Sequence, residues 1–311
     1  METPPLSPPS TRLALGHLDV TPAATDRDTL AGLLDAYVRH VPWESASRIA
    51  KRAANKDTRD CPRWPDEFWS DAARFGTGGT CFESNYAFFS LLRALGYHGY
   101  LTINDMNATR GCHTAIIIRL DGERLLVDAG FPVHSLIALD EHEATQSASA
   151  YQTYTLQPEG DRRFTLTRGP HPAPYCFTLI DQPIADQDYR AATTADYGDA
   201  GLFLDQVIVT RVVDGRIWRF ADREQPSRLA EFTGGSRTDH PIEGDIAATV
   251  GTRFGMDEAV LQRALAAIPD PSPGPAPRVS GGRGRGRGRS NPPPPPRPPP
   301  LRPLPRRLPD S

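Results

Sequence analysis

A cysteine, a histidine and an aspartate in the first half of the sequence are of the types that carry out nucleophilic acyl transfer. Cys81 follows the glycine-rich stretch Gly76-Thr-Gly-Gly-Thr80, and His113 and Asp128 come later in the chain. A thiolate is a strong nucleophile, an imidazole can accept the thiol proton, and a carboxylate can fix the imidazole tautomer. The three residues therefore indicate cysteine-based catalysis, provided that the fold brings them together.

Cys81 is expected to be the first residue of a buried helix. Thr80 and Glu83 fit a Thr-x-x-Glu capping box, and Gly96 is a natural end. Unpaired N–H groups and the positive end of the helix dipole favour a thiolate at such a position, although free cysteines are commonly inert and buried. Apolar residues recur between these ends at helical spacing: Phe88, Leu91, Leu92 and Leu95.

His113 and Asp128 are expected on the two strands of one β-hairpin. The apolar run that begins after His113 is followed by Asp121-Gly122, a strong two-residue turn signal, and a second apolar run ends at Asp128. Pairing the strands directly across this turn makes His113 and Asp128 diagonal neighbours on one face. A histidine alone is more often structural, and the nearby aspartate is what favours a catalytic pair.

The elements that must position these residues are helical first and β-rich afterwards. A helix capped by Asp26 is predicted at the start, and strand patterning prevails from about residue 98. Residues 257–268 are again helical in pattern. This order indicates an α+β fold and not a doubly wound parallel sheet. Strands are predicted at 114–120, 124–127, 152–156, 164–167, 206–213 and 216–220, the last two joined by a second Asp-Gly turn.

Residues 271–311 differ in composition from the rest of the 311-residue chain. They hold 15 of its 32 prolines and nine arginines, against a single acid, Asp310. A segment without apolar periodicity cannot bury enough surface to offset the entropy of ordering, so we predict a disordered Pro/Arg/Gly-rich tail. Its arginine-glycine run at 282–289 and proline run at 292–300 are compositional signals only, and nucleic-acid binding is not predicted from them.

Other features of the sequence bear on where the protein is located and on whether it binds a metal. The sequence has no run of about 18 apolar residues, so no membrane span is expected. Its Pro- and Ser-rich start lacks the features of a secretory signal. We therefore expect a cytoplasmic protein with reduced cysteines and a flexible N-terminus over residues 1–25. The four cysteines form no Cys-x-x-Cys pair, and the adjacent side chains of Cys112 and His113 converge poorly on one ion, so no metal site is predicted.

Three sequence motifs resemble those of the arylamine N-acetyltransferases. Residues 78–85, Gly-Gly-Thr-Cys-Phe-Glu-Ser-Asn, are similar to the family's Arg-Gly-Gly-x-Cys-Phe-Glu-x-Asn motif. Residues 127–131, Val-Asp-Ala-Gly-Phe, resemble its Val-Asp-x-Gly-Phe element, with His113 at the matching place between the two. Residues 41–45, Val-Pro-Trp-Glu-Ser, resemble its Ile-Pro-Phe-Glu-Asn. The resemblance extends over about residues 28–268.

The resemblance implies a three-part body and a two-step reaction. A helical bundle over 26–97 would carry Cys81, a β-barrel over 98–200 would carry His113 and Asp128, and an α/β lid would span 201–270. Acetyl-coenzyme A would acylate Cys81, and an aromatic amine or hydrazine would then take the acetyl group. Phe131 would line the acceptor pocket, and the loop from Thr109 to Cys112 would approach the pantetheine arm.

The sequence departs from the family pattern at three positions around the pocket. Thr77 replaces the motif arginine, Thr80 replaces an aromatic residue, and Pro132 replaces a glycine. Because none of them belongs to the Cys-His-Asp set, the departures bear on the substrate more than on the mechanism. An amide synthase fed by a carrier protein, a cysteine hydrolase with the same triad and a non-catalytic relative remain alternatives at this stage.

Overall fold

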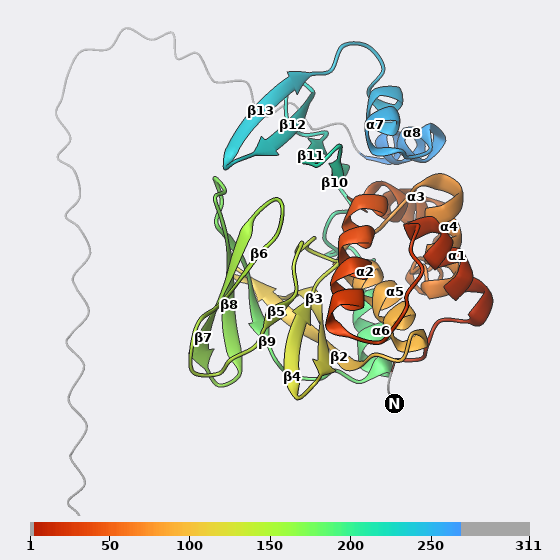
Figure 1. Cartoon of the computed structure of the whole chain (residues 1–311). Helices are drawn as coiled ribbons and strands as arrows, with labels where there is room; N and C mark the ends of the chain where they lie inside the picture. Colours follow the sequence, from red (N-terminus) through yellow and green to blue (C-terminus); the bar gives the residue numbers. More distant parts are fainter. Residues whose placement is uncertain (1–2, 269–311) are drawn as a thin grey trace, which may run out of the picture. The chain divides into compact units, whose positions relative to one another are not determined.

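The computed structural model describes residues 3–268, and the predicted disordered tail at 271–311 lies outside the described residues (Figure 1). Its secondary structure is of mixed α and β type, as the sequence predicts. The helices before residue 97 are α1 (Pro8–Leu18), α2 (Arg27–His40), α3 (Ala46–Ala54), the 3-10 helix η1 (Thr58–Asp60), α4 (Pro65–Phe75) and α5 (Cys81–Ala94). Asp26 caps α2 through its side chain, which accepts a hydrogen bond from the Thr29 N–H at 2.8 Å.

The prediction of a flexible N-terminus is wrong for the described residues, because α1 forms there. Ser7 is its N-cap and Pro8 its first residue, an arrangement in which a serine oxygen accepts from the helix and proline loses no bond. Leu6, Ala14 and Leu18 are buried, and α1 packs against α2, α4 and α5. A composition rich in proline and serine thus starts a helix here.

A nearly closed antiparallel sheet follows the helices. Its strand order is β5-β4-β3-β2-β9-β8-β7-β6, and the edge strands are joined by a hydrogen bond from the Thr145 hydroxyl on β6 to the Ala138 carbonyl on β5, at 2.6 Å. The strands are β2 (His98–Met106), β3 (Thr109–Leu120), β4 (Glu123–Val127), β5 (Ile137–Ala138), β6 (Thr145–Ala148), β7 (Thr153–Gly160), β8 (Arg163–Gly169) and β9 (Tyr175–Ile180).

The hairpin of β3 and β4 has the predicted register. Leu120 pairs with Glu123 across the turn. Asp121 and Gly122 both have positive φ, 51° and 81°, as a type I′ turn requires. The register brings His113 and the residue after β4, Asp128, to the same end of the hairpin.

A second sheet combines strands from distant parts of the sequence. Its order is β1-β10-β11-β12-β13, so that β1 from the helical region pairs with β10. The predicted division of the chain at residue 200 therefore does not separate the two regions in space. The elements are β1 (Trp43–Glu44), α6 (Asp186–Ala195), β10 (Ile208–Val213), β11 (Arg216–Ala221), β12 (Arg228–Thr233), β13 (Ser236–Pro241), α7 (Ile246–Phe254) and α8 (Glu258–Ala267).

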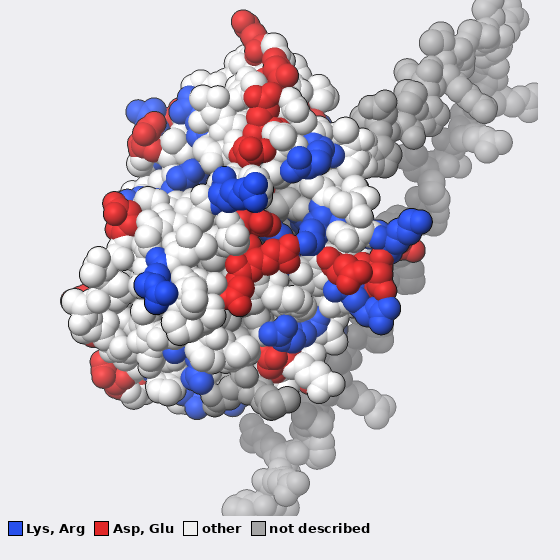
Figure 2. Space-filling view, turned by 90° about the vertical axis from the view of Figure 1, so that its right-hand side faces the viewer, with Lys and Arg blue, Asp and Glu red and all other residues white. Residues whose placement is uncertain are grey.

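The surface of the described residues carries charges of both signs. On the face presented in Figure 2, acidic and basic side chains are interspersed. None of the helices within residues 3–268 has the length and apolar character needed to cross a bilayer.

Candidate active site

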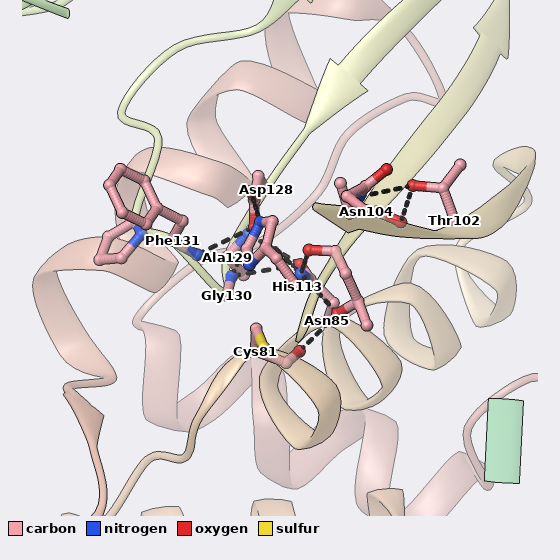
Figure 3. A network of polar contacts seen from close by, with 12 residues as sticks. Cys81, Asn85, Thr102, Asn104, His113, Asp128, Ala129, Gly130 and Phe131 are labelled. Carbon is pink, nitrogen blue, oxygen red and sulfur yellow. Dashed lines mark hydrogen bonds and ion pairs between the residues drawn. The ribbon is translucent and has the colours of Figure 1, made fainter. Parts of the chain in front are cut away.

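The structure brings Cys81, His113 and Asp128 together. Cys81 is the first residue of α5, His113 lies on β3, and Asp128 follows β4; Figure 3 shows them side by side. The His113 Nε2 lies 2.7 Å from the Asp128 Oδ2, and the Cys81 side chain lies beside the imidazole (Figure 3). All three residues are at most 5% exposed. The arrangement has the order of contacts that a nucleophile, a base and an orienting carboxylate need.

Asn85 is a site residue that reasoning from the sequence did not single out. Its Nδ2 donates to the Asp128 Oδ1 at 3.0 Å, and its Oδ1 accepts from the N–H groups of Ala129 and Gly130 at 2.9 and 3.2 Å. It lies four positions after Cys81, so both side chains lie on one face of α5. This i, i+4 spacing within the cysteine motif is the signal that would have identified Asn85.

Gly130 allows the end of β4 to approach the start of α5. A Cβ atom built at this position would lie 2.5 Å from the Asn85 Nδ2 and 2.6 Å from the Cys81 Cα, closer than real contacts allow. Thr114 links the same elements, because its hydroxyl donates to the Cys81 carbonyl at 2.9 Å. A glycine is therefore required for the close packing of the hairpin on Cys81.

Two opposing effects set the charge of His113. Burial disfavours the imidazolium, but the carboxylate and hydrogen bond of Asp128, together with Cys81, raise the pKa of His113 above its ordinary value. The raised pKa favours an imidazolium next to the cysteine. A protonated His113 stabilises a thiolate and holds a proton ready for a leaving group.

The predicted capping box at the start of α5 is wrong. The Thr80 side chain makes no capping hydrogen bond, and its buried hydroxyl has no partner within the described structure. Glu83 pairs instead with Arg63, whose Nη2 lies 2.6 Å from the Glu83 Oε2. A buried guanidinium is a stronger partner for a carboxylate than a backbone N–H, so the ion pair replaces the cap.

Arg63 also bears on the replacement of the motif arginine by Thr77. Its Nη1 lies 3.4 Å from the Thr77 hydroxyl, and its Nη2 donates to the Gly78 carbonyl at 2.5 Å. Arg63 and Glu83 are each 2% exposed. A guanidinium from the segment before α4 thus reaches the loop that leads into Cys81.

A cavity of about 450 Å³ opens beside the triad. Cys81 and His113 line it, as do the predicted substrate-binding residues Phe131 and Cys112. Thr109 does not belong to the lining, and it is the first residue of β3, so the predicted loop from Thr109 to Cys112 is part of a strand. The second sheet also contributes to the lining, with Thr210, Val212, Ile217 and Phe232 among its residues.

Comparison with known proteins identifies the family. A model of the N-acetyltransferase family matches residues 26–259. The chain belongs to this family. The match covers α2 through the start of α8, including the three residues of the triad. The resemblance to the arylamine N-acetyltransferases found in the sequence motifs is thereby confirmed. No curated protein matches the chain in sequence.

Solved structures of arylamine N-acetyltransferases share the fold of this N-acetyltransferase. The enzyme from Mycobacterium abscessus has 21% identity and a TM-score of 0.68, over 82% of this chain and 94% of its own. The Mycobacterium marinum enzyme in complex with CoA has 18% identity and a TM-score of 0.67, over 83% and 99%. The Bacillus cereus enzyme, described as having a unique Cys-His-Glu catalytic triad, has 13% identity and a TM-score of 0.66, over 81% and 100%.

Proposed function

We propose that this member of the family is an arylamine N-acetyltransferase that works through an acetyl-Cys81 intermediate. The acyl donor is acetyl-coenzyme A and the acceptor an aromatic amine or hydrazine. The observation that carries the proposal is the position of Cys81 at the start of α5, beside the His113–Asp128 pair (Figure 3) and open to a largely apolar cavity. An aromatic acceptor fits such walls, which include Phe131 and Phe232.

In the first half-reaction, Cys81 takes the acetyl group. His113 accepts the thiol proton, and the Cys81 sulfur forms a bond to the carbonyl carbon of the donor thioester. When the bond to the coenzyme sulfur breaks, the imidazolium returns the proton to the leaving thiolate. Asp128 stabilises the imidazolium throughout and does not itself take the proton.

In the second half-reaction, the amine takes the acetyl group from Cys81. The amine nitrogen attacks the thioester carbonyl, His113 accepts a proton from that nitrogen, and the C–S bond breaks. The products are the amide and the free cysteine. Every step uses the position of His113 beside Cys81 (Figure 3) and its hydrogen bond to Asp128.

The proposed location is the cytoplasm. The structure records Cys61, Cys81, Cys112 and Cys176 as free thiols. Free thiols are the usual state of cysteines in reducing compartments, and the mechanism needs Cys81 in that state.

The first test is an intact-mass measurement. We expect acetyl-coenzyme A to add one acetyl group to the purified protein, and an arylhydrazine to remove it. The Cys81→Ala variant should gain none, whereas Cys61→Ala, which changes a buried cysteine outside the cavity lining, should react as the wild type does.

An acetyl adduct that persists in Cys81→Ala would contradict the mechanism. Acylation by a carrier-bound acyl chain, with no reaction of acetyl-coenzyme A, would identify an amide synthase. Rapid loss of the acetyl group without an amine would identify a hydrolase.

A further inference from the structure

Two of the four cysteines face the same cavity. Cys81 and Cys112 both belong to its lining, whereas Cys61 and Cys176 are at most 1% exposed and lie outside it. All four are free thiols in the described part of the chain. The proposed acyl transfer uses the sulfur of Cys81 alone, so it leaves the thiol of Cys112 without a chemical role.

Cys112 is in direct contact with the nucleophile. The Cys81 thiol donates to the Cys112 carbonyl oxygen at a distance of 3.6 Å. The Cys112 thiol donates in turn to the Thr109 carbonyl oxygen at 3.3 Å, within its own strand. Because S–H groups are weak donors, these bonds oppose a change of side-chain rotamer only slightly. Side-chain rotation is therefore the movement by which the two sulfurs would meet.

The backbone around Cys112 is irregular. The ladder between β2 and β3 is interrupted at this point, and residues 110–112 of β3 face only Asp105 of β2. A bulge of this kind bends a strand and changes the direction of its side chains. Gly111, next to Cys112, has a φ of 64°, a conformation that glycine adopts without strain. The position of Cys112 is thus less constrained than that of a residue within a regular ladder.

The elements that carry the two cysteines are already packed together. Thr114 on β3 donates through its hydroxyl to the Cys81 carbonyl at 2.9 Å, and Asn85 on α5 donates to the Thr114 carbonyl at 2.6 Å. A disulfide needs Cα atoms about 4.4–6.8 Å apart, so it forms without strain only between backbones that are in contact. The start of α5 and β3 are in such contact, and a disulfide between them would need no large movement.

The two thiols have different environments. The raised pKa of His113 favours an imidazolium, which stabilises a thiolate at Cys81, and the thiolate is the form that oxidants attack. Burial raises the pKa of Cys112, which keeps this sulfur protonated and less reactive towards an oxidant. A peroxide would therefore oxidise Cys81 first, with Cys112 placed to react with the product.

We infer that Cys112 is a resolving cysteine for Cys81: when a peroxide oxidises the nucleophile, the two residues form a disulfide that a thiol reductant reverses. The disulfide inactivates the nucleophile for a time but prevents its further oxidation to an acid that cannot be reduced. This inference goes beyond the proposed function, because it concerns the reactivity of the two sulfurs and not acetyl transfer.

The oxidation takes two steps. The Cys81 thiolate attacks one oxygen of hydrogen peroxide, the O–O bond breaks, and the departing hydroxide takes a proton from His113 to become water. The Cys81 sulfur has then lost two electrons and is a sulfenic acid. The Cys112 sulfur attacks it, the S–O bond breaks, and hydroxide leaves as water with the Cys112 proton. One peroxide is thus reduced to two waters while two thiols become a disulfide.

Mass spectrometry tests the disulfide directly. We expect hydrogen peroxide to lower the intact mass by about 2 Da and to leave only Cys61 and Cys176 open to alkylation in denaturant. Proteolysis without a reductant should yield a peptide pair that joins Cys81 to Cys112. Neither measurement uses acetyl-coenzyme A, so the outcome is independent of whether the proposed function is correct.

Cys112→Ser tests the protective role of the second thiol. After peroxide and then dithiothreitol, the wild type should regain a Cys81 thiol that iodoacetamide alkylates. In the variant the sulfenic acid has no partner, so Cys81 should proceed to the sulfinic acid, a gain of about 32 Da that dithiothreitol does not reverse. The recovered fraction of Cys81 thiol should be about fivefold or more lower than in the wild type.

Cys176→Ala is the matched control. Cys176 is buried outside the cavity lining, and burial raises its pKa to about 12. This variant should form the same disulfide and recover as the wild type does. Diamide oxidises pairs of thiols without a sulfenic acid, and it should give the same cross-link in the wild type and in Cys176→Ala, and none in Cys112→Ser.

Two results would overturn the inference. The first is the absence of a peptide pair joining Cys81 to Cys112 after treatment of the folded protein with either oxidant. The second is an equal recovery of the Cys81 thiol in the wild type and in Cys112→Ser, which would show that Cys112 does not intercept the oxidised nucleophile.

Discussion

The Asp128 carboxylate divides its two oxygens between different tasks. Its Oδ1 accepts from the Asn85 side chain and from the N–H groups of Gly130 and Phe131, at 2.8 to 3.0 Å. Its Oδ2 is left for His113. Since three donors fix the carboxylate, it can orient the imidazole without moving itself. The carboxylate is also what raises the pKa of His113 against the effect of burial.

Asp128→Asn should therefore slow acetylation of Cys81 strongly while leaving the fold intact. The amide keeps an acceptor for the two N–H groups but removes the negative charge, so the pKa of His113 should fall. The rate of acetylation should drop by about 10⁴, as expected when a catalytic histidine loses its carboxylate. The measurement is mass-resolved acetylation between pH 6 and 9, alongside an NMR titration of His113.

The His113 pKa is expected to change in a defined direction. A raised pKa means that in the wild type the imidazolium persists as the pH rises past its ordinary value, about 6.5. In Asp128→Asn the ring should lose its proton at lower pH. An unchanged titration, or full activity of the variant, would show that Asp128 does not control the charge of His113.

Between elements, the loop that leads into α5 is held by a buried ion pair. Burial opposes the charge of Glu83, but Arg63 and its hydrogen bonds lower the pKa of Glu83, and the Tyr197 hydroxyl donates to the same carboxylate at 2.6 Å. Arg63 also contacts Gly78 in the loop. The position of Cys81 thus depends on a residue from a different segment of the chain.

Arg63→Met should destabilise the protein at neutral pH by about 3–5 kcal/mol, because it leaves the buried Glu83 carboxylate without its positively charged partner. A carboxylate with a lowered folded pKa contributes stability above its unfolded pKa, about 4.3, and loses it as the pH falls through the folded value. The deficit of the variant should therefore shrink as the pH falls, because protonation of Glu83 removes the unpaired buried charge in the variant and, below about pH 4, the contribution of the ion pair in the wild type. Urea unfolding at several pH values measures both effects.

Arg59→Met provides the control for this ion pair. Arg59 pairs with Asp57 at 2.5 Å, but its side chain is 82% exposed. An exposed pair contributes little, so this variant should unfold like the wild type. If the two variants were equally stable, the Arg63–Glu83 pair would not be what holds the loop.

Elements that are determined by residues close together in the sequence could be predicted. The helix that starts at Cys81 has apolar residues at helical spacing, and the Asp121-Gly122 turn determines the register of its hairpin, so both could be predicted. The capping box failed because Glu83 has a stronger partner 20 residues earlier in the chain. The Pro- and Ser-rich composition of the N-terminus likewise led to the wrong prediction there, because the start of α1 depends on one serine followed by one proline.

The cavity as a whole could not be predicted, because its walls come from distant parts of the sequence. Cys81 and His113 contribute from α5 and β3, whereas Ile217 and Phe232 contribute from strands about a hundred residues later. The register of neighbouring strands is a local property. The packing of one sheet near another depends on many weak contacts at once, and Ile217 and Phe232 reach the cavity only through them.

At the scale of the whole molecule, the described residues contain every part of the proposed machinery. The triad, the cavity lining and the three apolar clusters all lie within residues 3–268, and the family match ends at residue 259. Deleting residues 271–311 should therefore change the free energy of unfolding by no more than about 0.5 kcal/mol and leave Cys81 acetylation intact.

Deleting residues 1–25 should instead lower the free energy of unfolding by about 3 kcal/mol or more, because the buried side chains of Leu6 and Leu18 are lost from the core. Thermal unfolding measures the change in stability of both truncated proteins, and mass-resolved acetylation measures the reaction of Cys81 in each. A large loss on removing 271–311 would give that segment a role in the enzyme, and an unchanged protein without residues 1–25 would show that α1 is dispensable.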